Sequence, residues 1–267
     1  AGIGEGSVAR TYITGVLPVT MDDLTSGFNI GQIITLKKHT LEMMGFTQVE
    51  VEKYVGEIAA DHGWDDNLRR KVLDDLRIHY NGYRLLPDAA NTLYNSTICN
   101  FYLNDMVIEN DQTLPRETID QNLRTDTAWL YRLTGSAEET RNLVAQLMFD
   151  GALPVDMNML SSKFNMRQFF DKGFFPLSLY YLGMVTFRDR FTLEFPNLTV
   201  KTIFTQYFNE IERIDVSLGY TDMFRQFLSD HDWQALFAGY WKQYVGQIPA
   251  QASDQPSPKG YGLANKV

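Results

Sequence analysis

Cysteine is almost absent from the sequence, and basic residues are outnumbered by acidic ones. Cys99 is the single cysteine, which excludes a disulfide framework and a cysteine-based metal site. Lysine and arginine total 24 against 33 aspartate and glutamate residues, so the formal net charge is -9. A field of that sign repels phosphate backbones unless basic residues are concentrated locally. Nucleic acid is therefore not the expected partner.

Long apolar runs and export signals are also missing. No run approaches the roughly 20 apolar residues of a membrane-spanning helix, and residues 1–10 lack the basic start and apolar core of a signal peptide. Together with the single cysteine, these absences predict a cytoplasmic protein without membrane contact. The apolar fraction of 44% over 267 residues is enough for the core of one large domain or two ordinary ones.

A phosphate-binding loop is the third absence. A P-loop needs the string Gly-x-x-x-x-Gly-Lys-Ser/Thr, because its backbone amides cradle phosphates while the lysine and Mg²⁺ offset their charge. No such string occurs. Gly2, Gly4 and Gly6 are spaced like part of a glycine loop but lack the lysine, the hydroxyl residue and a preceding strand. We interpret this stretch as a flexible lead-in.

The segment from Thr11 to Ile30 has the pattern of a strand at the edge of a nucleotide-binding domain. An apolar run up to Val19 predicts a buried strand, and the Asp-rich and Ser-Gly-Phe-Asn residues that follow predict a loop. Thr14 lies at the strand exit, where a hydroxyl could orient a water near a γ-phosphate. Spacing alone favours an ordinary strand-end threonine.

Metal and catalytic constellations are not indicated elsewhere. Asp22, Asp23 and Glu50 are better explained as a helix cap and solvated carboxylates than as Mg²⁺ ligands, so no metal site is assigned. The four histidines have no partner residue at a triad or zinc spacing; they are His39, His62, His79 and His231.

Helical periodicity dominates the first half. Thr47 and Glu50 form a capping-box pattern before an apolar stripe, Asp65 or Asp66 can cap a second helix, and Asn95 or Ser96 a third. Between the last two lies a string of two aromatics, a tight turn and a cation, Tyr80 to Arg84. It could clamp a base or brace two helices, and bracing is favoured, with Gly82 as a plausible helix stop.

The second half begins with helices and then changes period. A further capping box at Ser136 and Glu139 predicts a helix that ends at Gly151, followed by short helices at Ser161 to Phe170 and Pro176 to Leu182. Residues 184–195 then alternate as a β-hairpin, which suggests a winged-helix module. Arg188 and Arg190 near its turn could touch DNA phosphates, although a solvated hairpin tip is favoured.

The C-terminal part predicts helices and a tail. Apolar residues from Val200 to Ile214 form the clearest stripe in the chain, and two aromatic-rich helices are expected around residues 223–228 and 233–245. Beyond Pro249 the composition becomes polar, which predicts a disordered or loosely docked tail.

Several strings together resemble a known family, the bacterial predicted AAA-ATPase-like family, whose members usually carry a C-terminal PD-(D/E)XK nuclease-like domain. The resemblance covers about Arg10 to about Ala252. The strings that carry it are Ile13 to Pro18, Asp22 to Asn29, Met44 to Thr47, Tyr80 to Tyr83, Leu93 to Ser96, Leu179 to Met184 and Phe195 to Val200.

The resemblance implies roles for particular residues. Thr14 corresponds to the polar sensor position beside the γ-phosphate, Phe46 to Asp105 to the helical lid, and Ser136 to Phe195 to a winged-helix-like domain. Within the lid and its turns, the implied residues are Asn81, Gly82, Tyr83, Tyr94 and Asn95. ATP and Mg²⁺ are implied for the full-length family only.

Departures from the family limit what this chain is expected to do. The family's P-loop and acidic Mg²⁺-binding strand lie upstream of the matched region, and its nuclease carboxylates lie downstream. The chain is therefore expected to be catalytically incomplete, to bind neither ATP nor Mg²⁺ alone, and to have the upstream ATPase core segment as its partner.

The expected fold is mainly α, with one remnant strand of an α/β P-loop core. Its expected divisions are the end of the ATPase core at 1–30, a helical lid region at 31–134, a winged-helix-like domain with one β-hairpin at 135–198, C-terminal helices at 199–248 and a flexible tail at 249–267. The alternative is a stand-alone helical module that binds a protein partner through its aromatic-rich C-terminal helices. A DNA-binding winged-helix regulator is a third and weaker alternative.

Overall fold

The computed structural model describes the chain from residue 34 to residue 248, with gaps. The described residues are 34, 36–109, 112–115, 119, 121–134, 138–161, 166–214, 223 and 227–248. The predicted strand at Thr11 to Val19, and with it Thr14, lies outside the described residues. So does the tail predicted beyond Pro249.

Three helices that run alternately in opposite directions, α2, α3 and α4, form the first unit, which we call the helical unit. After the short 3-10 helix η2 (Lys38–Met43) come α2 (Gln48–His62), α3 (Asp66–Tyr80) and α4 (Ser96–Glu109). The predicted capping box of α2 is confirmed, because the Thr47 amide donates to the Glu50 carboxylate over 2.8 Å and the Glu50 amide donates back to the Thr47 hydroxyl. Asp65 caps α3 with a single bond, in which its carboxylate accepts from the Leu68 amide over 2.7 Å.

The second unit, which we call the sheet unit, combines helices with a small sheet. Its helices and strands are α5 (Gln121–Thr134), α6 (Glu138–Asp150), β1 (Leu153–Pro154), α7 (Asn158–Ser161), α8 (Met166–Phe169), η3 (Lys172–Phe174), α9 (Phe175–Tyr181), β2 (Thr186–Asp189), β3 (Thr192–Glu194) and α10 (Leu198–Ile211). The last of these carries the stripe predicted from Val200 onward, and Val200, Ile203, Phe204, Tyr207 and Phe208 are all buried.

The sheet has three antiparallel strands in the order β1-β3-β2. The predicted hairpin is confirmed as β2 and β3, with Phe187 paired with Leu193 and a register shift before Asp189. The third strand was not predicted. Leu153 and Pro154 are too few to show an alternating pattern, and proline is tolerated here because β1 is an edge strand.

Hydrophobic packing divides the described chain into two cores. Members of the first come from α2, α3 and α4, and members of the second come from α5 onward. The division falls between Leu114, which packs on the first core, and Ile119, which packs on the second. Helix α5 therefore shares its core with the sheet unit, although the boundaries of functional domains stay predictions.

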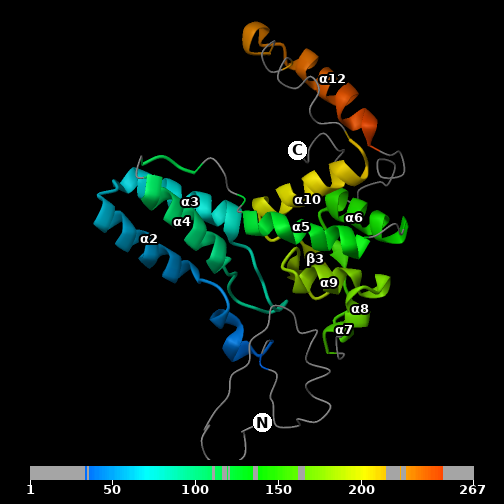
Figure 1. Cartoon of the computed structure of the whole chain (residues 1–267), viewed down its shortest axis with the longest axis horizontal. Helices are drawn as coiled ribbons and strands as arrows, with labels where there is room; N and C mark the ends of the chain where they lie inside the picture. Colours follow the sequence, from blue (N-terminus) through cyan, green and yellow to red (C-terminus); the bar gives the residue numbers. More distant parts are fainter. Residues whose placement is uncertain are drawn as a thin grey trace, which may run out of the picture.

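Figure 1 shows the two units side by side, with the chain between α3 and α4 running along the space between them. Helix α12 (Trp233–Gln243), followed by η4 (Val245–Gln247), extends away from both units on the side of α10. The fold is mainly helical, as expected. Among the described residues, none of the helices has the length and apolar character that crossing a bilayer requires.

Candidate functional site

The segment from Tyr80 to Leu85 forms a junction between the two units. It leaves α3, pairs with the chain that enters α4, and contacts the hairpin and the start of α10. Tyr83 and Leu93 form an isolated antiparallel bridge with amide-to-carbonyl distances of 3.1 and 2.8 Å. Phe46 and Tyr94 form a second bridge with the same two distances. The two bridges thereby fix the chain before α4 in register with the chain before α2 and with the chain after α3.

Gly82 is the position at which the junction meets the loop before α10. Its φ of 103° lies in the region that favours glycine, and a Cβ atom built there would lie 1.8 Å from the Pro196 carbonyl oxygen. The neighbouring Asn81 holds the turn, since its side-chain oxygen accepts from the Gly82 amide over 2.6 Å. Asn197 donates its side-chain amide to the Asn81 carbonyl over 3.0 Å. Only glycine allows this close approach.

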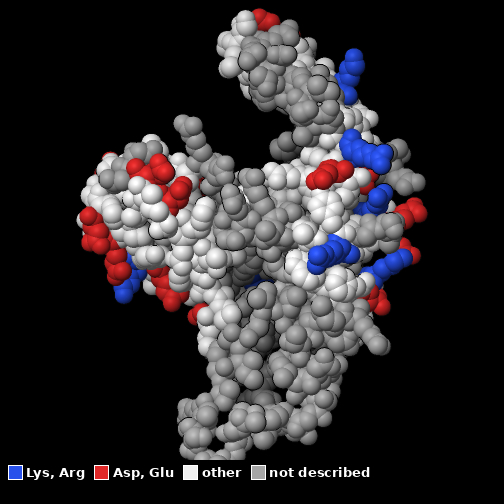
Figure 2. Space-filling view, in the orientation of Figure 1, with Lys and Arg blue, Asp and Glu red and all other residues white. Residues whose placement is uncertain are grey.

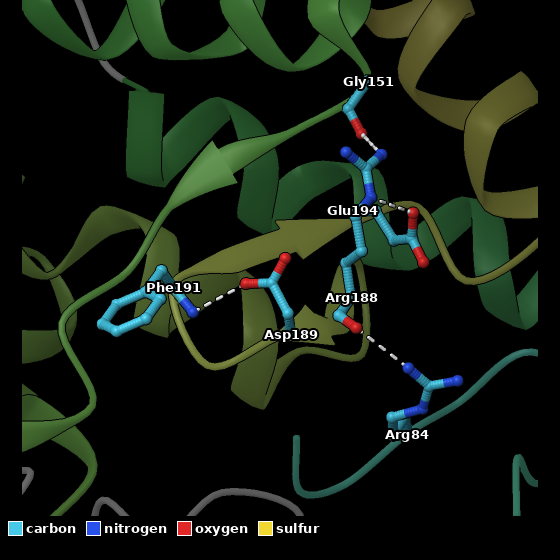
Figure 3. Close-up of polar contacts among 6 residues, drawn as sticks. All are labelled: Arg84, Gly151, Arg188, Asp189, Phe191 and Glu194. Atoms are coloured by element: carbon cyan, nitrogen blue, oxygen red, sulfur yellow. Dashed lines mark hydrogen bonds and ion pairs between the residues drawn. The ribbon is translucent and has the colours of Figure 1, made fainter. Parts of the chain in front are cut away.

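Arg84 ties the junction to the β-hairpin. The Thr186 hydroxyl accepts from the Arg84 amide over 2.6 Å and donates to the Arg84 carbonyl over 3.0 Å. The Arg84 guanidinium donates to the Arg188 carbonyl, further along the same strand β2, over 2.9 Å (Figure 3). One residue further, the Tyr180 hydroxyl donates to the Leu85 carbonyl over 2.7 Å. The junction backbone thus extends the hydrogen bonding of the sheet unit.

Tyr94 and Asn95 secure the junction to the helical unit. Tyr94 is buried, its hydroxyl donates to the Gln48 side chain over 2.5 Å, and burial raises the pKa of that hydroxyl. The Asn95 side chain accepts from the Thr97 and Ile98 amides, so it caps α4 as predicted. The Asn95 amide donates to the Tyr80 carbonyl over 3.0 Å. Both residues therefore have structural roles.

A chain of polar side chains runs from α4 through α3 to α10. The Tyr102 hydroxyl donates to Asp75 over 2.7 Å, and the second Asp75 oxygen lies 3.7 Å from His79 Nε2. His79 Nδ1 lies 3.1 Å from the buried Thr199 hydroxyl on α10. The pKa of the Tyr102 hydroxyl is raised, chiefly because the group is buried and in addition because it donates to Asp75. This relay is a second polar connection between the units.

A small cavity lies beside the junction, between η2 and the residues that follow Tyr83. Its volume is about 240 Å³, and its lining includes Tyr83, Leu85 and Leu93. Two polar contacts border it, the Lys38–Asp88 ion pair at 2.5 Å and the Asn91–Glu42 hydrogen bond at 2.9 Å. That ion pair lowers the pKa of Asp88. The cavity is smaller than the roughly 300–1,000 Å³ of typical small-molecule sites.

The structure brings five of the six predicted site residues together. Asn81, Gly82 and Tyr83 lie in the junction, and Tyr94 and Asn95 lie beside it on the chain that enters α4; together they make backbone pairs, a turn and a cap. Thr14 lies outside the described residues. Within the described part of the chain, histidine, cysteine and acidic side chains form no group of three that could hold a metal ion.

Sequence reasoning missed the partners that the junction uses in the other unit. Thr186 and Thr199 are buried threonines whose hydroxyls contact the junction and the relay. Arg84 and His79 were recognised only as part of a turn and as a scattered histidine. A threonine in a strand or at a helix start is ordinary, so the sequence contained no signal that these residues bridge two units.

The hairpin arginine Arg188 is already engaged within the sheet unit. Its Nε donates to Glu194 over 2.6 Å and its Nη2 donates to the Gly151 carbonyl over 3.0 Å (Figure 3). Across the junction, exposed carboxylates of α2 gather on the helical unit (Figure 2); they are Glu50, Glu52, Glu57 and Asp61. The acidic surface of α2 disfavours a phosphate backbone as its ligand.

The fold and the junction together define a mainly helical protein of two units joined by an extended connector. In comparisons with protein-family models, curated proteins and solved structures, nothing matches the chain.

Proposed function

We propose that this chain is the sensor, lid and winged-helix portion of an AAA-like ATP-binding protein, and that it is catalytically incomplete by itself. One observation carries the proposal: strings that carry the family resemblance, although distant in sequence, lie against one another at the junction. Phe46 pairs with Tyr94, and Gly82 lies against Pro196. Five of the seven strings contribute; they are those at 44–47, 80–83, 93–96, 179–184 and 195–200.

The proposed role of the junction is mechanical coupling. Helices α3 and α4 would belong to the lid over a nucleotide, and α10 and the hairpin to the winged-helix-like part. A lid movement that displaced the Tyr80 end of α3 would pull on Thr186 through Arg84 and on Asn197 through Asn81. Such coupling requires an element with two arrangements whose balance both parts influence.

ATP and Mg²⁺ belong to the proposed whole protein, and the described residues do not fit them. The sequence has no glycine-rich loop followed by Lys and Ser/Thr, and the cavity beside the junction is bordered by a Lys–Asp pair that already neutralises its lysine. We therefore derive no phosphoryl-transfer step through these residues.

The direct test is calorimetric titration of Mg²⁺–ATP into the chain. The expected result is no saturable binding, and micromolar affinity for the chain alone would overturn the claim that it is incomplete.

A cheaper test reads the coding sequence on the N-terminal side. A glycine-rich loop ending in Lys-Ser/Thr is expected there, and its absence would remove the support for an ATPase portion.

A second candidate is a stand-alone helical module that binds a protein partner. The observation that favours it is the exposure of large aromatic side chains on α12, Trp233, Phe237 and Trp241.

The third alternative, a DNA-binding regulator, has less support because Arg188 is paired with Glu194. Salt-dependent retention on duplex DNA would favour it over both others, since phosphate neutralisation produces a salt slope.

A further inference from the structure

Helix α12 presents an aromatic stripe, which we define as Trp233, Phe237 and Trp241. Residues four apart lie on the same face of a helix, and these three side chains are 58%, 61% and 52% exposed. The partly buried residues of α12, among them Leu236 and Tyr240, lie on the adjacent face. Trp233 and Phe237 stack with ring centroids 6.0 Å apart, so their rings form one continuous aromatic surface.

Charge limits what the aromatic stripe can bind. The only charged side chain within α12 is Lys242, and the residues just before the helix include the exposed carboxylates of Asp230 and Asp232. Nucleic acids and anionic membranes are bound through several lysines and arginines beside the aromatics, whereas this helix has Lys242 alone, and two acidic residues lie just before its start. An apolar protein surface is the chemistry that matches the stripe, because exposed contiguous aromatics mark protein contacts.

The stripe has the symmetry of a self-complementary surface. Its residue types read Trp-Phe-Trp in both directions around Phe237. A twofold axis beside Phe237 would place the Phe237 ring of one copy against the Phe237 ring of a second copy. The same axis would place Trp233 of each copy against Trp241 of the other. The antiparallel orientation also sets the acidic start of one helix, with Asp230 and Asp232, alongside the Lys242 end of the other, whereas a parallel orientation would set like charges side by side.

We propose that α12 pairs with α12 of a second copy of this chain, antiparallel, through the aromatic stripe. Helix α12 extends away from both units, so two copies can approach along it (Figure 1). An aromatic side chain buries about 150–250 Å², so the three half-exposed rings supply roughly 300 Å² per copy. This is below the ~800 Å² per partner of a standard interface. The dimer is therefore weak and depends on concentration.

The first test measures self-association of the full chain by sedimentation equilibrium across the micromolar range. A reversible monomer–dimer equilibrium is expected, and Phe237→Asp should raise its Kd about ten-fold or more, because two carboxylates would face each other in the apolar centre. The matched control is Ala235→Asp, which adds the same charge on the opposite, exposed face of the helix. It should leave Kd within about two-fold.

A second test measures orientation by disulfide trapping. Cys99 is buried, so a cysteine introduced into α12 supplies the accessible thiol. Antiparallel pairing predicts that a mixture of W233C and W241C chains forms crossed disulfides faster than either chain alone. A monomer at all concentrations, equal effects of F237D and A235D, or faster self-pairing of W233C would each overturn the proposal. Circular dichroism of each variant establishes that the helices are intact.

Discussion

Gly82 carries the tightest steric constraint among the described glycines. Its positive φ and the approach of the Pro196 carbonyl both require the absence of a side chain. Asn81 supports the same turn from one side and Tyr83 pairs with Leu93 on the other. These neighbours explain why an aromatic-flanked Asn-Gly turn stands at the meeting point of two units.

Replacing Gly82 by alanine should therefore destabilise the fold. The expected loss is more than about 2 kcal/mol of unfolding free energy, since the new Cβ atom forces the Pro196 loop away and strains the backbone. Urea denaturation followed by circular dichroism measures it. The matched control is Gly56→Ala in α2, where a Cβ atom meets nothing within 4 Å. That control should gain up to about 1 kcal/mol from helix propensity, and equal effects at the two glycines would contradict the account.

The buried thiol of Cys99 should make the stability of the fold depend on pH. Burial raises the pKa of its thiol from 9.0 to about 12, so the folded state holds a proton that the unfolded state releases first. The stability that this group contributes is complete below pH 9 and is lost as pH rises toward about 12. Unfolding free energies measured by urea titration between pH 8 and 10 should fall with a slope of up to ~1.4 kcal/mol per unit.

The Cys99→Ala variant isolates that contribution. It should lack the part of the slope that begins near pH 9, while tyrosine ionisation still appears above about pH 10 in both proteins. Identical slopes for the two proteins over this range would show that the thiol is not shielded as the structure indicates.

At the scale of elements, the helices were predictable and the connections between them were not. Side-chain caps, with a capping box at α2, and apolar periodicity located α2, α3, α4 and α10, because these signals come from residues within a few turns of one another. The Phe46–Tyr94 bridge pairs residues distant in sequence and the Tyr83–Leu93 bridge joins the ends of the loop between α3 and α4, and no helix or strand period specifies either pair. Strand β1 was missed for the related reason that its partner β3 lies far along the chain.

Thr186 tests the contact between the junction and β2. Thr186→Val keeps the shape of the side chain but removes the hydroxyl that bonds both the amide and the carbonyl of Arg84. The Arg84 amide would then be unpaired and the Arg84 carbonyl would keep only the long 3.5 Å bond from the Phe187 amide, which should cost about 1–3 kcal/mol in chemical denaturation. The comparison variant is Thr202→Val, whose exposed hydroxyl bonds only the Leu198 carbonyl of its own helix. A cost at Thr202 as large as that at Thr186 would argue against the junction as a special contact.

At the scale of the whole molecule, two separate cores are joined by hydrogen bonds and a relay of polar side chains. Each core has its own tryptophan, Trp64 in the helical unit and Trp129 packed on the sheet unit. Because the junction fixes one unit against the other, the two units should unfold together. Proteins retaining only Trp64 or only Trp129 should give the same urea midpoint by fluorescence.

Weakening the junction should separate those midpoints. Thr186→Val in each single-tryptophan background is expected to split the transition, since the cores themselves remain unchanged. Different midpoints without that substitution would mean that the units are energetically independent, and the proposed coupling would lose its basis.

Nucleotide binding tests the central claim most directly. Calorimetry should compare Mg²⁺–ATP titrated into the 267-residue chain with the same titration into the longer protein that the proposal requires, in which an ATPase core segment precedes this chain. The proposal predicts saturable binding only for the longer protein, because the phosphate-binding loop is absent from this sequence. Micromolar binding to the chain alone, or no binding to the longer protein, would contradict the proposal that the chain is the lid and winged-helix portion of an AAA-like ATP-binding protein.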